Sequence, residues 1–255
     1  MKTYIIAEVG PNHNGSLSLA KKYIDLISKS GANAVKFQLA RPLEVYSQDS
    51  FKANYQKKND GNRSIITMSR KNQLSYNDHL KLSKYSKKKR IDYLCSAFDI
   101  KSLEFLDKKI NVKYIKIPSG EIFDLNTLSY LSKIKKEILL STGMVTQKEL
   151  NKILKILNKN FKKKITILYC VSSYPTKPDQ INFSKMLKYK KKGYKIGFSD
   201  HTLTMNASII AVSLGARVIE KHVTVNKKLK GPDHKFSLNM KEFNELVINI
   251  REVEK

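Results

Sequence analysis

The chain has 255 residues, of which 41% are hydrophobic, so it is long and apolar enough for one large folded domain and is not a disordered chain. Its apolar stretches, such as Ile209–Leu214, are far shorter than the ~20 residues of a transmembrane helix, and residues 1–10 have the pattern of a first strand rather than a signal peptide. The formal net charge is +27.

Such a charge raises the question of nucleic acid binding. The lysine runs precede predicted strands, which places them on the face opposite the strand C-termini: Lys87–Arg90, Lys108–Lys109, Lys133 with Lys135–Lys136, Lys162–Lys164 and Lys190–Lys192. The chain is also rich in Ile and Asn, so a general composition bias accounts for the lysines. We expect no specific nucleic-acid partner, only a weak attraction to RNA or anionic membranes that fades with added salt.

Eight strand-like runs recur along the chain. They are nearly continuously apolar, as parallel strands covered by helices are. In chain order they are Tyr4–Gly10, Ala34–Ala40, Tyr93–Asp99, Tyr114–Gly120, Ile138–Gly143, Ile165–Tyr174, Lys195–His201 and Val218–Val225.

Amphipathic helical patterns lie between most of these runs. Ser16–Ser30 has apolar residues at helical spacing, with Gly31 as a stop, and Thr146–Asn158 opens with a Thr-x-x-Glu capping box. Asn206–Leu214 and Met240–Val253 complete the series. The alternation predicts an α/β protein, a (β/α)8 TIM barrel, with residues 1–255 as a single domain. A doubly wound sheet is the competing fold, but no Gly-x-Gly-x-x-Gly motif follows the first strand.

The connection Arg41–Asn77 is much longer than the roughly 2–6 residues of a usual βα loop. Its polar stretch Gln56–Asn62 predicts a mobile cover over the barrel mouth. Cys95 and Cys170 lie within apolar strand patterns and lack the spacing of a metal site or a disulfide framework. We interpret them as buried free thiols in a reducing cytoplasm, where we expect the protein to be.

Four of the five histidines follow predicted strands, namely His13, His201, His222 and His234, whereas His79 lies on a helical pattern. The C-termini of barrel strands open onto one face, so such residues can converge there. Histidine binds metals and titrates near neutrality. His201 and His222 end neighbouring strands, so they predict either a shared divalent metal or, alternatively, hydrogen-bonded structural roles.

Lys36 and Lys116 lie inside apolar strands, where an ammonium group costs several kcal/mol unless an anion compensates it. With the strand-end serines they predict a pocket for a phosphate or a phosphate-bearing carboxylate. These serines are Ser96, Ser119, Ser141 and Ser199. Two alternatives remain open: each lysine pairs with a strand carboxylate such as Glu8 or Glu220, or one forms a Schiff base.

Three further side chains at strand ends are candidates for substrate contact. Gln38 points the same way as Lys36 under strand alternation. Tyr174, before Pro175, is either a stacking wall for a substrate or part of a rigid strand exit. Asp233 either accepts hydrogen bonds from sugar hydroxyls or belongs to a plain turn.

These residues resemble those of the sialic acid synthase family, the phosphoenolpyruvate-dependent N-acetylneuraminate synthases. The matching segments occur in the family's order, cover almost the entire chain and are highly specific as a set. They are Ile6–Gly10, Asn12–Gly15, Val35–Gln38, Lys116–Glu121, Ser141–Met144, Tyr174–Pro175, Gly197–Thr202 and Glu220–His222.

The resemblance implies a barrel that condenses phosphoenolpyruvate with an N-acetylated amino sugar, such as N-acetylmannosamine, and releases phosphate. It implies a divalent ion on His201 and His222, manganese above magnesium or cobalt, and catalytic roles for Glu8, Glu121 and His201. The residues implied to contact the two substrates are Lys36, Ser96, Lys116, Ser119, Ser141, Ser172 and Ser199 for phosphoenolpyruvate, and Gln38, Glu121, Tyr174 and Asp233 for the sugar.

The chain departs from the family pattern at three places. Cys95–Asp99 stands where the family often has Ser-Thr-Pro-Phe-Asp, and Ser172 stands where an asparagine usually helps to hold phosphoenolpyruvate. The family's C-terminal antifreeze-like domain, which donates an arginine to the partner subunit's sugar site, has no counterpart before Lys255. We expect the barrel domain only, with a homodimer or a separate domain acting in trans as candidate partners.

Two other functions stay open. A related synthase would use a different amino sugar and make a pseudaminic, legionaminic or similar acid. A non-catalytic barrel would bind an anion or a partner through its basic face.

Overall fold

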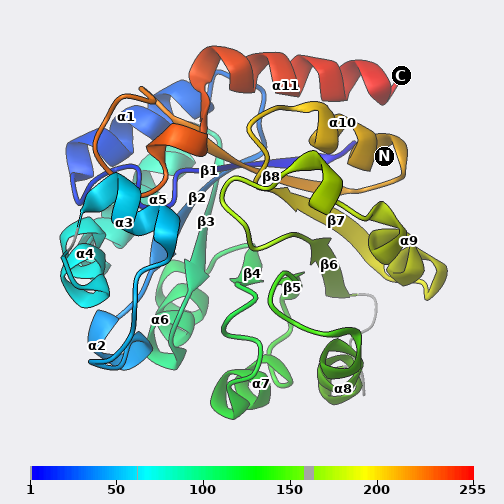
Figure 1. Cartoon of the computed structure of the whole chain (residues 1–255), viewed down its shortest axis with the longest axis horizontal. Helices are drawn as coiled ribbons and strands as arrows, with labels where there is room; N and C mark the ends of the chain where they lie inside the picture. Colours follow the sequence, from blue (N-terminus) through cyan, green and yellow to red (C-terminus); the bar gives the residue numbers. More distant parts are fainter. Residues whose placement is uncertain (1, 62, 158–163) are drawn as a thin grey trace.

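The computed structural model describes residues 2–61, 63–157 and 164–255 (Figure 1). Eight parallel strands pair in sequence order, and β1 also pairs with β8, which closes the barrel. The fold is therefore the predicted (β/α)8 TIM barrel. The strands are β1 (Tyr4–Glu8), β2 (Ala34–Leu39), β3 (Asp92–Ala97), β4 (Tyr114–Ile117), β5 (Glu137–Ser141), β6 (Ile165–Tyr169), β7 (Lys195–Asp200) and β8 (Val218–Thr224).

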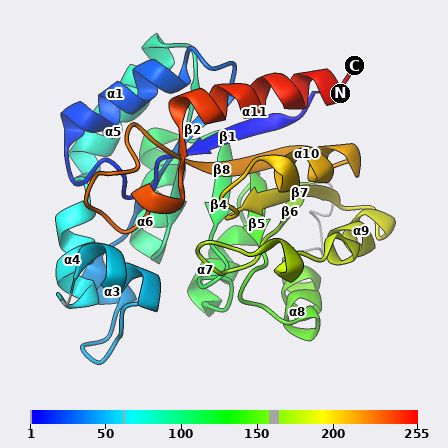
Figure 2. The same cartoon turned by 45° about the horizontal axis from the view of Figure 1, so that its top comes forward.

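Helices follow the strands and cover the barrel from outside (Figures 1 and 2). Ser16 caps α1 by accepting the amide of Leu19, and Thr146 exchanges hydrogen bonds with Glu149 at the start of α8, as its motif predicts. The predicted last residue of that helix, 158, and the lysines at 162–163 lie outside the described residues. These helices are α1 (Leu17–Ile27), α5 (Tyr76–Lys88), α6 (Ile100–Phe105), α7 (Leu125–Leu131), α8 (Gln147–Leu157), α9 (Phe183–Lys191), α10 (Asn206–Ser213) and α11 (Met240–Val253).

The long connection after β2 contains three short helices that were not predicted. They are α2 (Pro42–Val45), α3 (Asn54–Asp60) and α4 (Ile65–Asn72), and they form one group beside the barrel (Figures 1 and 2). Shorter elements are a π-helical turn at Leu106–Ile110, 3₁₀ turns at Pro178–Gln180 and His234–Phe236, and the two-residue strand β9 (Leu238–Asn239) beside β8.

The barrel interior is closed at its lower end by a small apolar layer. Its members come from six strands and are all buried: Ile6, Ala34, Leu94, Leu139, Leu168 and Val218. A much larger apolar cluster fills the space between the strands and the helices. Because side chains alternate along a strand, the next inward position is two residues further on. These positions include Glu8, Lys36, Ser96, Ser141 and Glu220, so the polar groups form the layer directly above the apolar one.

The predicted lysine runs that the structure describes precede β3, β4, β5 and β7, at the end of the barrel opposite the polar layer. Cys95 and Cys170 are buried free thiols, as predicted. In the described part of the chain, no helix is both long and apolar enough to cross a lipid bilayer.

Candidate active site

The buried lysines and carboxylates of β1, β2, β4 and β8 form one connected ring. Lys36 Nζ lies 2.8 Å from Glu8 Oε2 and 3.5 Å from Glu220 Oε2, and it donates to Ser96 Oγ at 2.8 Å. Lys116 Nζ donates to Glu220 Oε1 at 3.1 Å. Both lysines thus pair with strand carboxylates, which is one of the alternatives left open by the sequence. The same ring also gathers the predicted anion-binding cations at one point.

The charge balance of this ring depends on Glu8. Burial raises the pKa of Glu8 even though Lys36 opposes the shift. Burial acts in the same direction on Glu220, but the ammonium groups of Lys116 and Lys36 hold its pKa below the ordinary value. Glu220 is therefore the carboxylate that stays ionised. Any protonation of Glu8 leaves the ring with an excess of positive charge. Such a ring favours an anionic ligand.

An inner cavity of about 520 Å³ lies above the ring and contains almost all the predicted site residues. Glycine at position 143 lets the turn after β5 approach the segment after β6, because a Cβ there would lie 2.3 Å from Ser172 Oγ. The predicted residues that line the inner cavity are Glu8, Lys36, Gln38, Ser96, Lys116, Ser119, Glu121, Ser141, Ser172, Tyr174, Ser199, His201 and His222.

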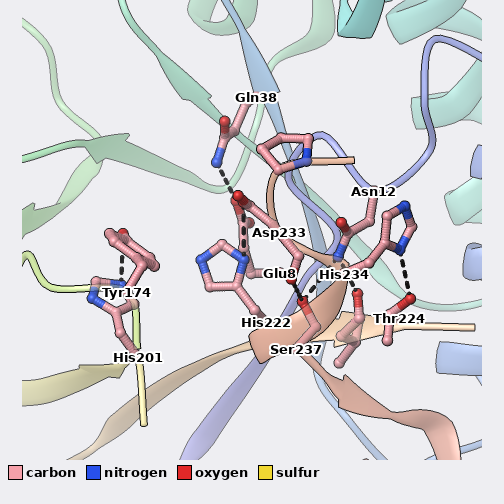
Figure 3. Close-up of polar contacts among 12 residues, drawn as sticks. Glu8, Asn12, Gln38, Tyr174, His201, His222, Thr224, Asp233, His234 and Ser237 are labelled. Atoms are coloured by element: carbon pink, nitrogen blue, oxygen red, sulfur yellow. Dashed lines mark hydrogen bonds and ion pairs between the residues drawn. The ribbon is translucent and has the colours of Figure 1, made fainter. Parts of the chain in front are cut away.

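His201 and His222 lie at the mouth side of the inner cavity with ring centroids 5.7 Å apart (Figure 3). His201 Nδ1 lies 2.7 Å from the carbonyl oxygen of Val171, which can only accept, so Nδ1 carries the proton. Nε2 then presents a lone pair, and the Tyr174 hydroxyl donates to it at 3.0 Å. A backbone partner of this kind is a common way to orient a metal-binding imidazole.

His222 differs from His201 in its hydrogen bonding. Its Nδ1 is buried without a hydrogen-bond partner among the described residues, and it lies 3.6 Å from Asp233 Oδ2. Burial lowers the pKa of both imidazoles, that of His201 to about 4, so both are neutral at pH 7. Neutral imidazoles can give a lone pair to a divalent cation, although the ion would have to replace the Tyr174 hydroxyl at His201 Nε2. Within the described ranges no three His, Cys, Asp or Glu side chains are grouped to hold a metal, so other ligands would be water or substrate.

Three carboxyl and amide groups surround the mouth of the cavity. Gln38 donates to Glu8 Oε1 at 2.8 Å, which confirms that it points inward like Lys36. Burial raises the pKa of Asp233 to about 8, with a contribution from the charge of Glu8. Burial, then Asp124 and Asp99, raises the pKa of Glu121 to about 7. Asp233 lines the adjoining space rather than the inner cavity itself.

His13 and His234 do not line the inner cavity, so the predicted gathering of four histidines holds for two of them. His13 Nδ1 accepts from the amide of Gly15, and His234 Nδ1 lies 2.8 Å from Thr224 Oγ1. Both imidazoles tie loops together. His79 lies on α5, as predicted, and contacts the Tyr93 hydroxyl.

The long connection lines one side of the mouth, where a mobile cover was predicted, and brings in a residue that the strand-end reasoning missed. Tyr55 of α3 lies with its ring 5.3 Å from that of Tyr174 and 5.7 Å from that of Phe236. Asn59 donates to the carbonyl of Pro232 at 2.9 Å and joins the connection to the last βα loop. Tyr55 lies in a polar segment without a strand pattern, so the sequence gave no sign that its side chain reaches the mouth.

The comparisons with known proteins agree with this arrangement. The model of the NeuB family matches residues 23–255. The N,N'-diacetyllegionaminic acid synthase of Campylobacter jejuni is 42% identical over 100% of this chain and 77% of its own length. The human N-acetylneuraminate-9-phosphate synthase is 34% identical, over 99% of this chain and 70% of its own.

A crystal structure of the N-acetylneuraminic acid synthetase of Leptospira borgpetersenii superposes with a TM-score of 0.89 at 31% identity. It covers 99% of this chain, which in turn covers 84% of that one. The family model matches most of the chain, and relatives above 30% identity match nearly all of it. This protein therefore belongs to the NeuB family.

Proposed function

We propose that this protein condenses phosphoenolpyruvate with an N-acetylated amino sugar, such as N-acetylmannosamine, to form a nonulosonic acid, and releases phosphate. The observation that carries the proposal is the buried ring of Lys36 and Lys116 directly beneath the paired imidazoles of His201 and His222. The ring supplies an anion site and the imidazoles a potential cation site within a single cavity.

Phosphoenolpyruvate would lie at the ring. Its phosphoryl and carboxylate groups would compete with the carboxylates for the two ammonium groups, and the surrounding serine hydroxyls would donate hydrogen bonds to them. Fixing both anionic ends aligns C3 of the donor toward the mouth, which reduces the entropic part of the barrier.

The reaction forms a carbon–carbon bond and a carbon–oxygen bond to water, and it breaks the carbon–oxygen bond to phosphate. C3 of phosphoenolpyruvate attacks the aldehyde carbon of the open-chain sugar, and the aldehyde oxygen takes the electron pair and a proton. Water adds to C2 and gives up a proton, which Glu8 would accept in its ionised form, since its side chain lines the cavity. The tetrahedral intermediate then expels phosphate with the bonding pair of the C2–O bond, leaving the 2-keto acid.

His201 and His222 would hold a divalent cation, Mn²⁺ in our proposal, with Mg²⁺ or Co²⁺ as alternatives. When bound, such an ion supplies Lewis-acid stabilisation to negative charge on an oxygen. Gln38, Glu121, Tyr174 and Asp233 would contact the sugar, since they surround the mouth above the ring.

A synthase for a different acceptor is the second candidate. The observation in its favour is the 42% identity with a protein named as an N,N'-diacetyllegionaminic acid synthase. The ring and the imidazoles would serve the same chemistry, and only the contacts to the sugar would differ.

The test is phosphate release from phosphoenolpyruvate with a panel of amino sugars, with EDTA and after addition of Mn²⁺. We expect release that requires both an amino sugar and the metal, and loss of it in His222→Ala with an unchanged circular dichroism spectrum. A barrel that only binds an anion or a partner would release no phosphate with any acceptor. Equal turnover in EDTA would reject the metal role alone.

A further inference from the structure

Asp233 lies at the mouth of the inner cavity without a hydrogen bond to hold its carboxylate. Its Oδ2 is 3.6 Å from His222 Nδ1, and within the described residues no group donates a hydrogen bond to the carboxylate. The position of this side chain therefore depends on the backbone of the loop between β8 and β9, residues 225–237. Contacts that fix this loop also fix one of the proposed contacts with the sugar.

Asn12 connects the exit of β1 to this loop through Ser237 (Figure 3). Its Nδ2 donates to the carbonyl of Val223 and to Ser237 Oγ, both at 2.9 Å. Ser237 Oγ in turn donates to the carbonyl of Asp233 at 2.7 Å, and both side chains of this path are buried. These hydrogen bonds form a continuous path from the barrel to the backbone of Asp233, which we call the Asn12–Ser237 bridge.

One atom of the bridge is left without a hydrogen bond. The Val223 carbonyl can only accept, so the amino group of Asn12 must face it and the amide oxygen must point away. Asn12 Oδ1 is consequently buried without a partner in the part of the chain that the structure describes. Such an atom lowers stability, and natural proteins break this rule mainly at functional sites. An asparagine at this position therefore favours a role beyond packing.

A second contact joins the same two loops directly after Asp233. His234 Nδ1 lies 2.8 Å from Thr224 Oγ1, and its Nε2 lies 3.3 Å from Asn14 Oδ1. Gly231 allows this approach, because a Cβ there would lie 2.7 Å from His234 Cδ2 and 2.9 Å from Asn14 Oδ1. These contacts keep the two loops together when the bridge is broken. Loss of the bridge should therefore displace Asp233 without unfolding the loop.

We infer that Asn12 and Ser237 are positioning residues that hold Asp233 beside His222, where its carboxylate can meet a hydroxyl group of the sugar. Neither Asn12 nor Ser237 is among the residues that line the inner cavity or the space adjoining it, so both act through Asp233. The inference rests on the proposed function and identifies the part of the chain that sets its sugar site. Loss of the bridge should weaken sugar binding and leave the binding of phosphoenolpyruvate unchanged.

The test compares two Michaelis constants of wild type and Ser237→Ala, measured by phosphate release. We expect KM for the amino sugar to rise about ten-fold, because a small misplacement of a substrate contact has a large effect, and KM for phosphoenolpyruvate to stay within about two-fold. Ser237→Thr keeps the hydroxyl and should keep the wild-type KM for the sugar. An equal rise of both constants, or an unchanged KM for the sugar, would overturn the inference.

The matched control is Ser30→Ala, at the opposite end of the barrel. It removes a hydroxyl that donates to the carbonyl of Ile27, also at 2.7 Å, and should change neither Michaelis constant. Asn12→Ala tests the other end of the bridge and should raise the same constant as Ser237→Ala. The double variant should be little worse than either alone, since both changes break one path. Additive effects would contradict the bridge, and if Asn12→Ala does not fold, the Ser237 variants decide.

Direct binding separates the bridge from the reaction. Calorimetry is done with N-acetylmannosamine and with a 2,4-diacetamido-2,4,6-trideoxy hexose, and a sugar that binds wild type should have a dissociation constant about ten-fold higher in Ser237→Ala. If neither sugar releases phosphate but this difference is seen, the proposed reaction fails and the bridge stands. If phosphate is released but the two proteins bind the sugar equally, the bridge fails and the reaction stands. No binding of either sugar to wild type would reject both.

Discussion

Glu220 contacts both lysines of the ring, Lys36 and Lys116. It accepts from Lys116 at 3.1 Å and from Ser199 at 2.8 Å, and lies 3.5 Å from Lys36. A carboxylate in this position preserves the charge of two cations in the absence of ligand. It therefore keeps the anion site ready at a cost in stability that an apolar layer would not incur.

Lys116→Met tests this interpretation. Removal of one partner leaves the other charge buried, so we expect a loss of about 3–5 kcal/mol in the free energy of unfolding, measured in urea. The double variant Lys116→Met with Glu220→Leu removes both charges and should recover most of that stability. It should not recover phosphate release. Recovery of activity in the double variant would show that Lys116 serves only as a partner of Glu220.

Glu121 makes stability depend on pH in an unusual direction. Its pKa is raised to about 7 in the folded state, mainly by burial, so its contribution to stability is full below its ordinary value and is lost as pH rises through 7. Glu121→Gln should therefore be more stable than wild type at pH 8, by about 1 kcal/mol or less because the side chain is partly exposed. The gain should vanish near pH 4. Urea unfolding of both proteins at pH 8 and near pH 4 measures this difference in stability. A gain in stability that does not depend on pH would contradict the raised pKa.

Much of the site could be predicted from residue types, because lysine and histidine are costly in a strand unless something compensates them. The contacts that these residues make with other parts of the chain could not be predicted. Nothing in the spacing shows that His201 binds the Val171 carbonyl, or that Ser69 and Asn72 of α4 face the mouth. Those contacts depend on how the connection after β2 folds back, and that segment has no periodic pattern.

At the scale of elements, the two faces of β8 have different roles: one contributes side chains to the site and the other anchors a neighbouring loop. Glu220 and His222 point into the barrel, whereas Lys221 between them points outward and is 1% exposed. Its Nζ lies 3.0 Å from Asp200 Oδ2 and donates to the carbonyls of Thr202 and Thr204, both at 2.7 Å. The lysine thus fixes the loop that follows His201.

Lys221→Met should lower the free energy of unfolding by about 3–5 kcal/mol, since it leaves Asp200 buried without its cation. It should also weaken Mn²⁺ binding, measured by calorimetry, because the His201 loop loses its anchor. The matched control is Lys227→Met, which breaks a half-exposed pair with Glu242 and should cost about 1 kcal/mol or less. Equal losses of unfolding free energy in the two variants would show that the buried ion pair of Lys221 contributes no more to stability than the half-exposed pair of Lys227.

The strands followed from their continuous apolar runs, and α1, α8, α10 and α11 followed from their helical patterns. The helices α2, α3 and α4 did not, since they are short and polar and are held by contacts such as that of Asn59 with Pro232. Propensity alone does not form helices of this length. Their positions are decided by the barrel that they cover.

At the scale of the whole molecule, the described lysine runs and the site lie at opposite ends of the barrel. The described lysine runs precede the strands, whereas the cavity lies beyond the strand C-termini. The net charge of +27 should therefore attract polyanions without affecting catalysis directly.

We expect a labelled single-stranded RNA to bind at roughly 50 mM salt and to dissociate by roughly 500 mM, with little dependence on its sequence. Fluorescence anisotropy across a salt series measures this. Saturating RNA should leave phosphate release unchanged. Tight binding of one sequence at the higher salt would instead indicate a specific nucleic-acid partner.

The apolar layer of Ile6, Leu94 and their neighbours has a kinetic consequence, because it makes the barrel a tube with one open end. Lys36 and Lys116 lie at its bottom, and Tyr55 and Tyr174 near its opening. A ligand that binds at Lys36 and Lys116 must therefore enter before a ligand that fills the opening near Tyr55 and Tyr174. If phosphoenolpyruvate binds at the ring as proposed, it should therefore bind before the sugar, and phosphate should leave after the sugar product.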